Sequence, residues 1–195
     1  MSGAEPSGTG SDHLGVRVGL GVDAHRFDSE RPLVLGGVRI REHGGLAGHS
    51  DADVVVHALM DALLGAAGLE DIGHFFPDSD PAFEGADSVV LLRRVVGLLA
   101  ERGLTVGNVD VVVICEEPRI ALHRAAIKAV LAPVLGVEAE RVGIRGTTTE
   151  GMGFAGRGEG IVAQAVALLE PRRPTPRVAR LSVVATQRTE PPPRR

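Results

Sequence analysis

Aromatic side chains are scarce in this 195-residue chain, which has five Phe and neither Trp nor Tyr. A protein that binds single-stranded nucleic acid without sequence preference stacks successive bases on aromatic rings, and an aromatic content of 3% cannot supply that platform. The net charge of −4 also argues against a duplex-binding protein, because such binding depends on a basic surface. The composition therefore predicts that nucleic acid is not a partner.

Cysteine and long apolar runs are also nearly absent. Cys115 is the only cysteine, so no disulfide forms within the chain, and this cysteine usage fits a reducing cytosol. Because Cys115 ends the apolar run of residues 111–115, a buried thiol is favoured over a reactive one. No stretch reaches the ~18 apolar residues of a membrane span, and the N-terminus has no apolar signal segment. We expect a soluble, cytoplasmic protein without membrane contact.

Charge and proline are distributed unevenly along the chain. Residues 171–195 contain seven Arg and one Glu (+6) and six of the 12 prolines, whereas residues 1–170 contain 14 basic and 24 acidic residues (−10). We expect residues 171–195 to be a disordered, basic Pro/Arg-rich tail, in which 178–185 could form a short strand. Residues 1–13 are expected to be a disordered leader, which leaves 14–170 as one domain.

Helix-like and strand-like segments interleave in this domain. We expect strands at residues 16–22, 109–115, 141–146 and 161–169, a hairpin of 33–35 with 38–40, and helices at 54–67, 87–102 and 118–135. Segment 161–169 fits a strand or a helix, because only Gln164 interrupts its apolar run, and we favour the strand. Ser50 is expected to cap the first helix, and Pro133 to end or kink the last. This order predicts an α/β fold of the α+β type, a two-layer sandwich in which one mixed β-sheet packs on helices.

Three candidate metal ligands come from two segments. Asp23 and His25 lie two positions apart at the end of a predicted strand, so their side chains point to one face. His57 lies in a predicted helix with Asp53 and Asp61 four residues to either side, and either carboxylate could accept its second N–H. Three mixed N/O ligands with an open fourth position are typical of catalytic zinc. Taken alone, His57 fits a core histidine and the Asp-x-His pattern fits a polar loop, so the metal interpretation depends on the neighbouring motifs.

Polar loops carry groups suited to phosphate. Residues 49–51 (His-Ser-Asp) precede a helix, whose free N–H groups and dipole favour an anion, although simple capping would also explain them. Loop 71–80 places Phe75 and Phe76 among acidic residues, which is unusual for a solvated loop and favours one that orders on a ligand. Residues 147–150 (Thr-Thr-Thr-Glu) offer three hydroxyls and a carboxylate after a strand.

A G-x-G-x-x-G pattern at Gly151, Gly153 and Gly156 does not indicate a dinucleotide site. No βαβ unit follows it, and no acidic residue lies about 20 positions on to hold a ribose. The glycines are better explained by tight turns and close backbone approach.

Together the motifs resemble the 2-C-methyl-D-erythritol 2,4-cyclodiphosphate synthase family of the non-mevalonate isoprenoid pathway. The resemblance covers residues 16–169 and rests on five ordered motifs: Gly-Val-Asp-Ala-His-Arg-Phe; Gly-His-Ser-Asp-Ala-Asp-Val with His57 beyond it; Asp-Ile-Gly before Phe-Pro-Asp-Ser-Asp-Pro; Gly-Asn-Val-Asp; and Thr-Thr-Thr-Glu leading to Gly-Phe-Ala-Gly-Arg-Gly-Glu-Gly. It implies a metal-dependent phosphorus–oxygen lyase that cyclises 4-diphosphocytidyl-2-C-methyl-D-erythritol 2-phosphate to 2-C-methyl-D-erythritol 2,4-cyclodiphosphate and releases CMP. It also implies a homotrimer with active sites between subunits.

The resemblance further assigns roles to residues of this chain. It implies Zn²⁺ on Asp23, His25 and His57, and Mg²⁺ or Mn²⁺ bridging the diphosphate with Glu150 as a contact. His49 and Thr148 match the catalytic positions that stabilise the transition state. The positions matching substrate contacts are Asp23, His25, His49, Ser50, Asp71, Ile72, Gly73, Phe76, Pro77, Asp78, Ser79, Asp80, Cys115, Glu116, Glu117, Pro118, Arg119, Ile120, Ala121, Thr147, Thr148, Thr149, Glu150, Phe154 and Arg157.

Within that set, the resemblance implies that residues 115–121 form a cytidine pocket and that loop 76–80 closes on the methylerythritol phosphate. Phe154 and Arg157 match positions near the trimer axis, where the family has a cavity that can hold an isoprenoid diphosphate. Arg119, Gly151 and His74 stand where many members have Lys, which alters phosphate contacts rather than the reaction.

Two other functions remain open from the sequence. A zinc phosphohydrolase would use metal-bound hydroxide and release CMP with a linear bisphosphate. A trimeric binding protein for isoprenoid diphosphates would have lost the chemistry, but all three metal ligands and both stabilising positions are retained, which favours the enzyme.

Overall fold

The computed structural model describes residues 15–172, so the leader 1–13, the possible strand at 178–185 and nearly all of the tail lie outside it. The strands are β1 (Arg17–Asp28), β2 (Leu33–Leu35), β3 (Val38–Arg41), β4 (Gly45–Leu46), β5 (Leu104–Ile114), β6 (Val142–Thr147) and β7 (Gly160–Pro171). The helices are α1 (Val54–Ala66), α2 (Ile72–Phe75), α3 (Ser88–Glu101), α4 (Arg124–Leu135) and α5 (Gly153–Gly156), with 3₁₀ turns η1 (Pro81–Phe83), η2 (Ile120–Leu122) and η3 (Ala139–Arg141). Within residues 15–172 there is no helix with the length and apolar character needed to span a bilayer.

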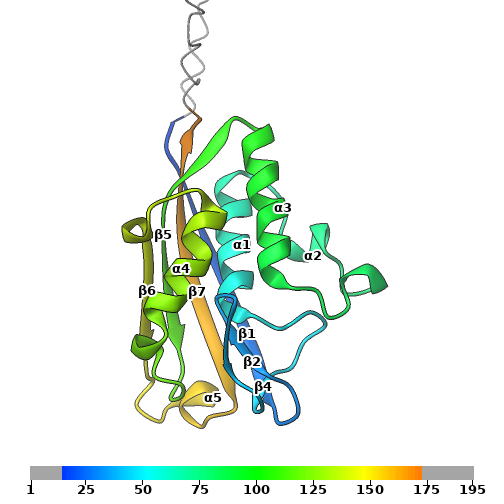
Figure 1. Ribbon diagram of the computed structural model, residues 1–195, viewed down its shortest axis with the longest axis vertical. Helices are drawn as coiled ribbons and strands as arrows, with labels where there is room; N and C mark the ends of the chain where they lie inside the picture. The colour runs from blue at the N-terminus through cyan, green and yellow to red at the C-terminus, as the bar shows by residue number, and fades with distance from the viewer. Residues whose placement is uncertain (1–14, 173–195) are drawn as a thin grey trace, which may run out of the picture.

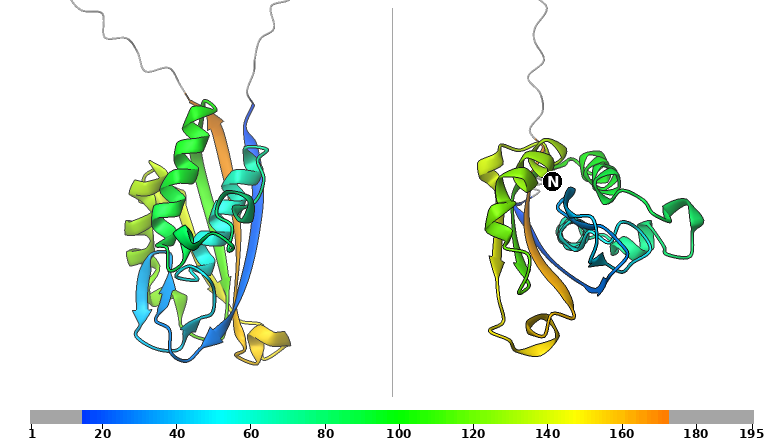
Figure 2. Two further views of the ribbon diagram at one scale, coloured as in Figure 1. Left: turned by 90° about the vertical axis from the view of Figure 1, so that its right-hand side faces the viewer. Right: turned by 60° about the horizontal axis from the view of Figure 1, so that its bottom comes forward.

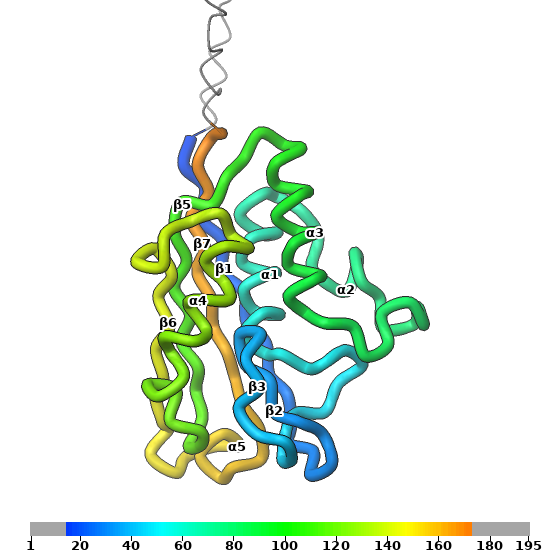
Figure 3. The backbone as a smooth tube through the Cα atoms, viewed as in Figure 1, coloured from blue at the N-terminus to red at the C-terminus, as the bar shows by residue number. Residues whose placement is uncertain are grey.

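One mixed sheet of order β4-β1-β7-β5-β6 forms a single layer, and α1, α3 and α4 lie on one of its faces (Figure 1). β7 pairs antiparallel with both β1 and β5, whereas β5 and β6 are parallel. β1 and β7 run side by side for their whole length, so the chain enters and leaves the sheet at the same end (Figure 3). The predicted fold class and the hairpin, which is β2 with β3, are confirmed.

β7 is a strand because its side chains alternate between the core and the open face. Ala163, Ala165, Ala167 and Leu169 are fully buried under the helices, whereas the intervening residues are partly or fully exposed. An alternation of period two cannot come from a helix. The strand favoured for residues 161–169 is therefore confirmed.

The outer face of β1 is apolar and uncovered in the single chain. Val18, Leu20 and Val22 are 65%, 66% and 51% exposed, and Val166 of the adjacent β7 is 44% exposed. The helices cover only the other face of this sheet (Figure 2, left). Four neighbouring aliphatic side chains on one strand pair form the kind of apolar patch that marks an interaction surface.

α1 is the buried centre of the domain and is capped by Asp53, not by Ser50 as predicted. The Asp53 carboxylate accepts from the N–H groups of Val55 and Val56 at 3.1 Å, and from Gly36 and Gly37 of the β2–β3 hairpin at 2.8 and 2.6 Å. Burial raises the pKa of Asp53 to about 6, against the opposing effect of these N–H donors. The helix begins at Val54, four residues after Ser50, so Asp53 rather than Ser50 is positioned to cap it.

Two glycines let α1 lie directly on β1. A Cβ on Gly19 would stand 2.1 Å from the carbonyl oxygen of Ala62, and one on Gly21 would stand 2.0 Å from that of Ala58. No side chain fits at these distances, so the helix backbone contacts the strand backbone.

The helix predicted for residues 118–135 is wrong in its first third. Backbone N–H groups of Leu122 and His123 bond three residues back, which makes η2, and α4 follows it. Pro133 does not end the helix. It lies in the last turn, and α4 continues to Leu135. Gly136 then caps it with φ 70°.

Candidate active site

A cluster of three side chains joins β1 to α1. The Asp23 carboxylate oxygen Oδ2 lies 3.0 Å from His25 Nε2 and 3.0 Å from His57 Nδ1, and the two ring nitrogens are 3.2 Å apart. The predicted metal ligands therefore meet, with one donor atom from each residue within 4.8 Å of the others. β1 continues to Asp28, so Asp23 and His25 lie inside the strand rather than at its end, on the face toward α1.

The donor set fits a divalent cation. His25 Nδ1 lies 2.6 Å from the carbonyl oxygen of Ala47, and because a carbonyl only accepts, Nδ1 carries the proton and Nε2 directs a lone pair into the cluster. A carboxylate oxygen and two imidazole nitrogens so close together need a positive charge among them. Two imidazoles and one carboxylate are ordinary ligands of catalytic zinc.

Electrostatics at the cluster favour that positive charge. Burial alone would raise the pKa of Asp23, but hydrogen bonds with His25 and His57 outweigh it and hold the pKa well below its usual value. The same Asp23 carboxylate raises the pKa of His25, against the effect of burial. These shifts favour the ionised form of Asp23, which is the form that binds a divalent cation.

The second nitrogen of His57 does not meet either aspartate predicted to accept from it. Asp53 caps α1, and Asp61 Oδ1 accepts from the backbone N–H of Ile72. His57 Nε2 instead lies 3.0 Å from the hydroxyl of Ser88 and 3.1 Å from that of Ser50. Residues four apart on a helix face are neighbours, but the backbone N–H groups nearby compete for their carboxylates.

A cavity of about 350 Å³ opens beside this cluster. Of the predicted substrate contacts, it is lined by Asp23, His25, His49, Ser50, Ile72, Gly73, Phe76, Pro77 and Asp78. His49 Nε2 is buried and has no hydrogen-bond partner within residues 15–172. A buried polar atom without a partner is rare and costly, so this nitrogen is available to a ligand.

The Arg31 side chain holds the loop that carries His49 in place. The Arg31 guanidinium donates to the carbonyl oxygens of Gly48 and Ser50, the residues on either side of His49. Both donors come from one planar group, which holds the loop in a fixed register. No sequence pattern indicates this role of Arg31, because it lies 17 residues before Gly48.

The loop of residues 71–80 contains the short helix α2 and projects from the body beside α3 (Figure 2, right). Asp71 caps α2 by accepting from the His74 N–H at 3.1 Å. Phe76 packs edge-on against Phe83, with ring centroids 5.4 Å apart. Phe75 and Phe76 are both half-buried, and Phe76 forms a wall of the cavity.

A second cavity, of about 220 Å³, lies toward the opposite edge of the sheet, where β5, β6 and η2 meet. Its predicted members are Cys115, Glu116, Pro118, Arg119, Ile120, Ala121, Thr147 and Thr148. Burial raises the pKa of Cys115 to about 11, and the Glu116 carboxylate adds to the effect, so the expected buried thiol is confirmed. Glu116 also accepts from the Thr149 N–H at 3.2 Å, which ties residues 115–121 to the Thr-Thr-Thr-Glu segment.

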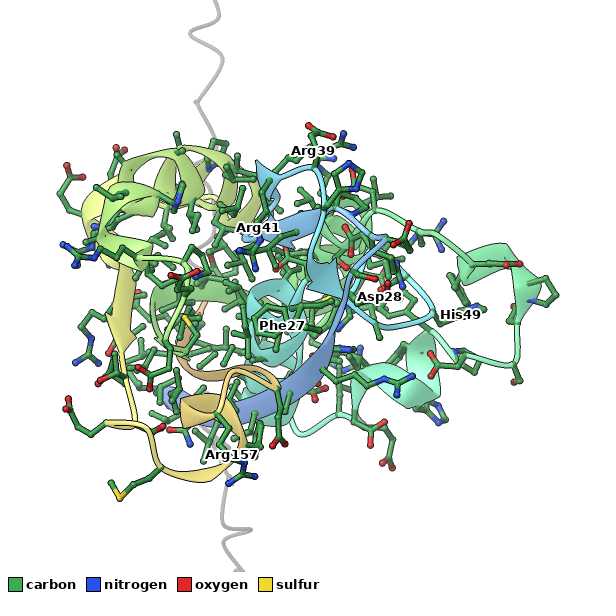
Figure 4. All side chains as sticks on the ribbon, turned by 90° about the horizontal axis from the view of Figure 1, so that it is seen from below. Phe27, Asp28, Arg39, Arg41, His49 and Arg157 are labelled. Carbon is green, nitrogen blue, oxygen red and sulfur yellow. The ribbon has the colours of Figure 1, made fainter. Side chains whose placement is uncertain are left out.

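The two predicted catalytic residues do not meet within one chain. His49 lines the first cavity, beside β1, and Thr148 lines the second, beside β6 at the opposite edge of the sheet. Figure 4 also shows His49 and Arg157 on well-separated loops. All the predicted substrate contacts stay predictions, and those that line neither cavity are Asp71, Ser79, Asp80, Glu117, Thr149, Glu150, Phe154 and Arg157.

Several residues of these sites are not apparent from the sequence. Met60, Phe83 and Leu91 supply apolar walls of the first cavity, and Arg124 adds a cation to the second. The apolar residues lie at ordinary core positions of helices and turns. Arg124 is the first residue of α4. It reaches the cavity because the chain changes from η2 to α4 just before it.

Comparisons with known proteins agree with this geometry. The YgbB family model matches residues 16–170. The chain is 63% identical over 162 residues to the 2-C-methyl-D-erythritol 2,4-cyclodiphosphate synthase of Rubrobacter xylanophilus, a match covering 80% of this chain and 96% of that protein. The bifunctional IspDF from Campylobacter jejuni superposes with a TM-score of 0.78 at 39% identity, covering 80% of this chain and 42% of that one.

A complex of Plasmodium falciparum IspF with CDP superposes with a TM-score of 0.72 at 33% identity, covering 82% of this chain and 98% of that one. Sequence and fold thus agree over nearly the whole described part of the chain. The chain belongs to the YgbB family.

Proposed function

We propose that this protein cyclises 4-diphosphocytidyl-2-C-methyl-D-erythritol 2-phosphate to 2-C-methyl-D-erythritol 2,4-cyclodiphosphate and releases CMP. The observation that carries the proposal is the first cavity, which is lined both by the Asp23–His25–His57 cluster and by His49, whose buried Nε2 has no hydrogen-bond partner among the described residues. The name of the Rubrobacter xylanophilus relative supports it.

The reaction needs no nucleophile from the protein. A phosphate monoester has a second pKa near 6 and is largely dianionic at neutral pH, so the 2-phosphate oxygen attacks the β-phosphorus itself. The bond from that phosphorus to the oxygen bridging to the α-phosphate breaks, and CMP leaves with the electron pair. Catalysis therefore consists of holding two anions in line, which can contribute up to roughly ten kcal/mol.

The residues of the first cavity provide that alignment. The phosphate to be cyclised would lie against Ser50 and α2, while Phe76 and Pro77 exclude water. We assign His49 Nε2 to donate to an oxygen of the phosphate under attack as its charge develops, which would account for its lack of a partner within residues 15–172. We assign Thr148 to stabilise the same charge from the nucleotide side, once its hydroxyl proton turns from Glu150, 3.0 Å away, to the phosphate.

We assign Zn²⁺ to Asp23, His25 and His57, and Mg²⁺ or Mn²⁺ to the diphosphate with Glu150 as a contact. When bound, these cations neutralise and polarise the diphosphate and stabilise the departing CMP. The −10 net charge of residues 1–170 would otherwise repel so anionic a substrate.

We assign the second cavity to the cytidine. The CDP bound to the Plasmodium falciparum relative supports a nucleotide-binding half-site in this fold. Cys115, Glu116 and residues 118–121 line the cavity from a loop and the 3₁₀ turn η2, whose backbone N–H and C=O groups suit recognition of a base.

We further propose a homotrimer in which the first cavity of one subunit faces the second cavity of its neighbour. The two half-sites lie toward opposite edges of one sheet, which supports a substrate site completed by a second subunit. The exposed face with Val18, Leu20 and Val22 supplies an apolar surface for that assembly. Phe154 and Arg157 would then lie near the axis, around a cavity for an isoprenoid diphosphate. We place the protein in the cytoplasm, in keeping with its single, reduced cysteine.

Product analysis tests the proposed reaction. The purified protein is incubated with the diphosphocytidyl substrate, Zn²⁺ and Mg²⁺, and the products are identified by mass. Cyclic diphosphate with equimolar CMP is expected. A linear bisphosphate, 18 mass units heavier through the added water, would instead establish the phosphohydrolase, and no turnover with retained isoprenoid diphosphate binding would establish the binding protein.

A further inference from the structure

The polar groups behind His57 form a chain that ends on a carboxylate. Ser88, the first residue of α3, is fully buried, and its hydroxyl lies 3.0 Å from His57 Nε2. The same hydroxyl makes a short hydrogen bond to Asp51 Oδ1, while the Ser88 backbone N–H donates to Asp51 Oδ2 at 3.0 Å. Asp51 thus holds Ser88 through both of its carboxylate oxygens.

The donor of each hydrogen bond in the relay His57–Ser88–Asp51 can be identified. An ionised carboxylate only accepts, so Ser88 must donate its single hydroxyl proton to Asp51. The Ser88 oxygen is then left with lone pairs only, and its contact with His57 Nε2 requires that Nε2 donate. His57 therefore carries a proton on Nε2, and its Nδ1, 3.0 Å from Asp23 Oδ2, is the nitrogen that faces the cluster.

We propose that Asp51 and Ser88 are positioning residues that fix the tautomer and ring orientation of His57, so that Nδ1 is always presented to the cation. The inference rests on the metal centre of the proposed function and extends it outward by two residues. Neither residue touches the substrate cavity, which Ser50 lines and Ser88 and Asp51 do not. Carboxylate partners of metal-bound histidines act in this way, here through an intervening hydroxyl.

Ser50 is the rival acceptor, because its hydroxyl lies 3.1 Å from the same nitrogen. Its oxygen already accepts from the Ala52 N–H at 3.2 Å, and no carboxylate orients its proton. Ser50 can therefore either donate to or accept from His57, whereas Ser88 can only accept. Only Ser88 can select one tautomer.

Zinc affinity, measured by competition with a chromophoric chelator, tests the relay in three variants. We expect Ser88→Ala to weaken binding about 10- to 100-fold, Ser88→Thr to restore it and Ser50→Ala to leave it within about threefold of wild type. Ser88→Ala keeps the backbone hydrogen bond to Asp51 and the cap residue Asp87, so α3 retains its first turn. Unchanged affinity in Ser88→Ala, or a greater loss in Ser50→Ala, overturns the proposal.

A spectroscopic measurement separates positioning from a merely structural role. In the zinc-loaded protein, ¹⁵N-detected NMR of the His57 ring should show a proton on Nε2 that exchanges slowly with water. In Ser88→Ala that proton should exchange at least about tenfold faster, because its acceptor is lost. A proton on Nδ1 in wild type would contradict the relay, whereas failure of wild type to bind zinc would instead contradict the metal centre.

Discussion

The Asp61 carboxylate on α1 accepts a hydrogen bond from the backbone N–H of Ile72 over 2.9 Å. Ile72 is the first residue of α2, so the buried helix that carries His57 also holds the start of the loop that walls the first cavity. Burial raises the pKa of Asp61, and the Ile72 N–H opposes that shift. Helix α1 therefore positions both the metal ligand His57 and the loop beside the substrate cavity.

Asp61→Ala should loosen this loop without removing a substrate contact. Loss of the acceptor leaves the Ile72 N–H unpaired, and we expect KM for the diphosphocytidyl substrate to rise about tenfold while kcat changes little. Asp61→Asn keeps an acceptor oxygen and is the matched control. Steady-state kinetics decide the matter: an unchanged KM in Asp61→Ala would show that the loop does not depend on this bond.

His57→Ala should remove the metal without unfolding the protein. We expect bound zinc to fall from one ion per chain to a trace and turnover to drop by at least about a thousandfold, because a three-ligand site cannot tolerate the loss of one ligand. Zinc content by atomic absorption and activity are measured together. His43→Ala, at an exposed histidine, is the control, and wild-type-like turnover in zinc-free His57→Ala would refute the assignment.

Subunit mixing should restore activity between two inactive variants. His57→Ala damages the first half-site and Thr148→Ala the second, and each homo-oligomer should be inactive or nearly so. After dissociation and reassembly at equal amounts, about a quarter of the sites would combine two intact halves, as random mixing in a closed ring requires. Activity of that size is expected, and none at all in verified hybrids would contradict a shared site.

The thiol of Cys115 should titrate late. Burial first, and the Glu116 carboxylate second, raise its pKa from 9.0 to about 11, so at pH 8 the reactive thiolate is about a hundredfold scarcer than for an ordinary thiol. Iodoacetamide should therefore label the native protein slowly, at a rate that still rises with pH above 9. The urea-unfolded chain is the control. A plateau at about pH 10 in the native protein would show that the thiol is unperturbed.

Asp53 and Asp87 provide a matched pair of helix caps. Asp87 accepts from two N–H groups of α3, whereas Asp53 accepts from two in α1 and two more in the β2–β3 hairpin. Asp87→Ala should cost about 1 kcal/mol of unfolding free energy, and Asp53→Ala about 2–4 kcal/mol because buried hairpin donors also lose their acceptor. Urea denaturation measures both, and equal losses would show that the hairpin bonds contribute nothing.

The sequence predicted the fold class and the metal cluster well because both follow from local patterns. Alternation on β1 and helical spacing on α1 each place side chains on a face, and Asp23, His25 and His57 needed only that these faces meet. The length of β1 was underestimated because residues beyond Val22 are polar yet still pair with β7.

Contacts between distant segments escaped prediction. The acceptors for His57 are serines, since hairpin N–H groups occupy Asp53 and the N–H of Ile72 occupies Asp61. That competition is decided by which loops reach α1, and no spacing rule contains it. The separation of His49 from Thr148 is likewise a property of strand order.

The glycines at positions 19 and 21 have a consequence for how this centre can change. These glycines bring α1 close to β1. The spacing between helix and strand therefore also sets the distance between the ligands on β1 and the ligand on α1. A methyl group at Gly21 would push the layers apart beside Asp23, and the cost would appear as a spoiled coordination geometry as well as a strained core. A substitution at either glycine therefore changes the core packing and the geometry of the metal ligands together.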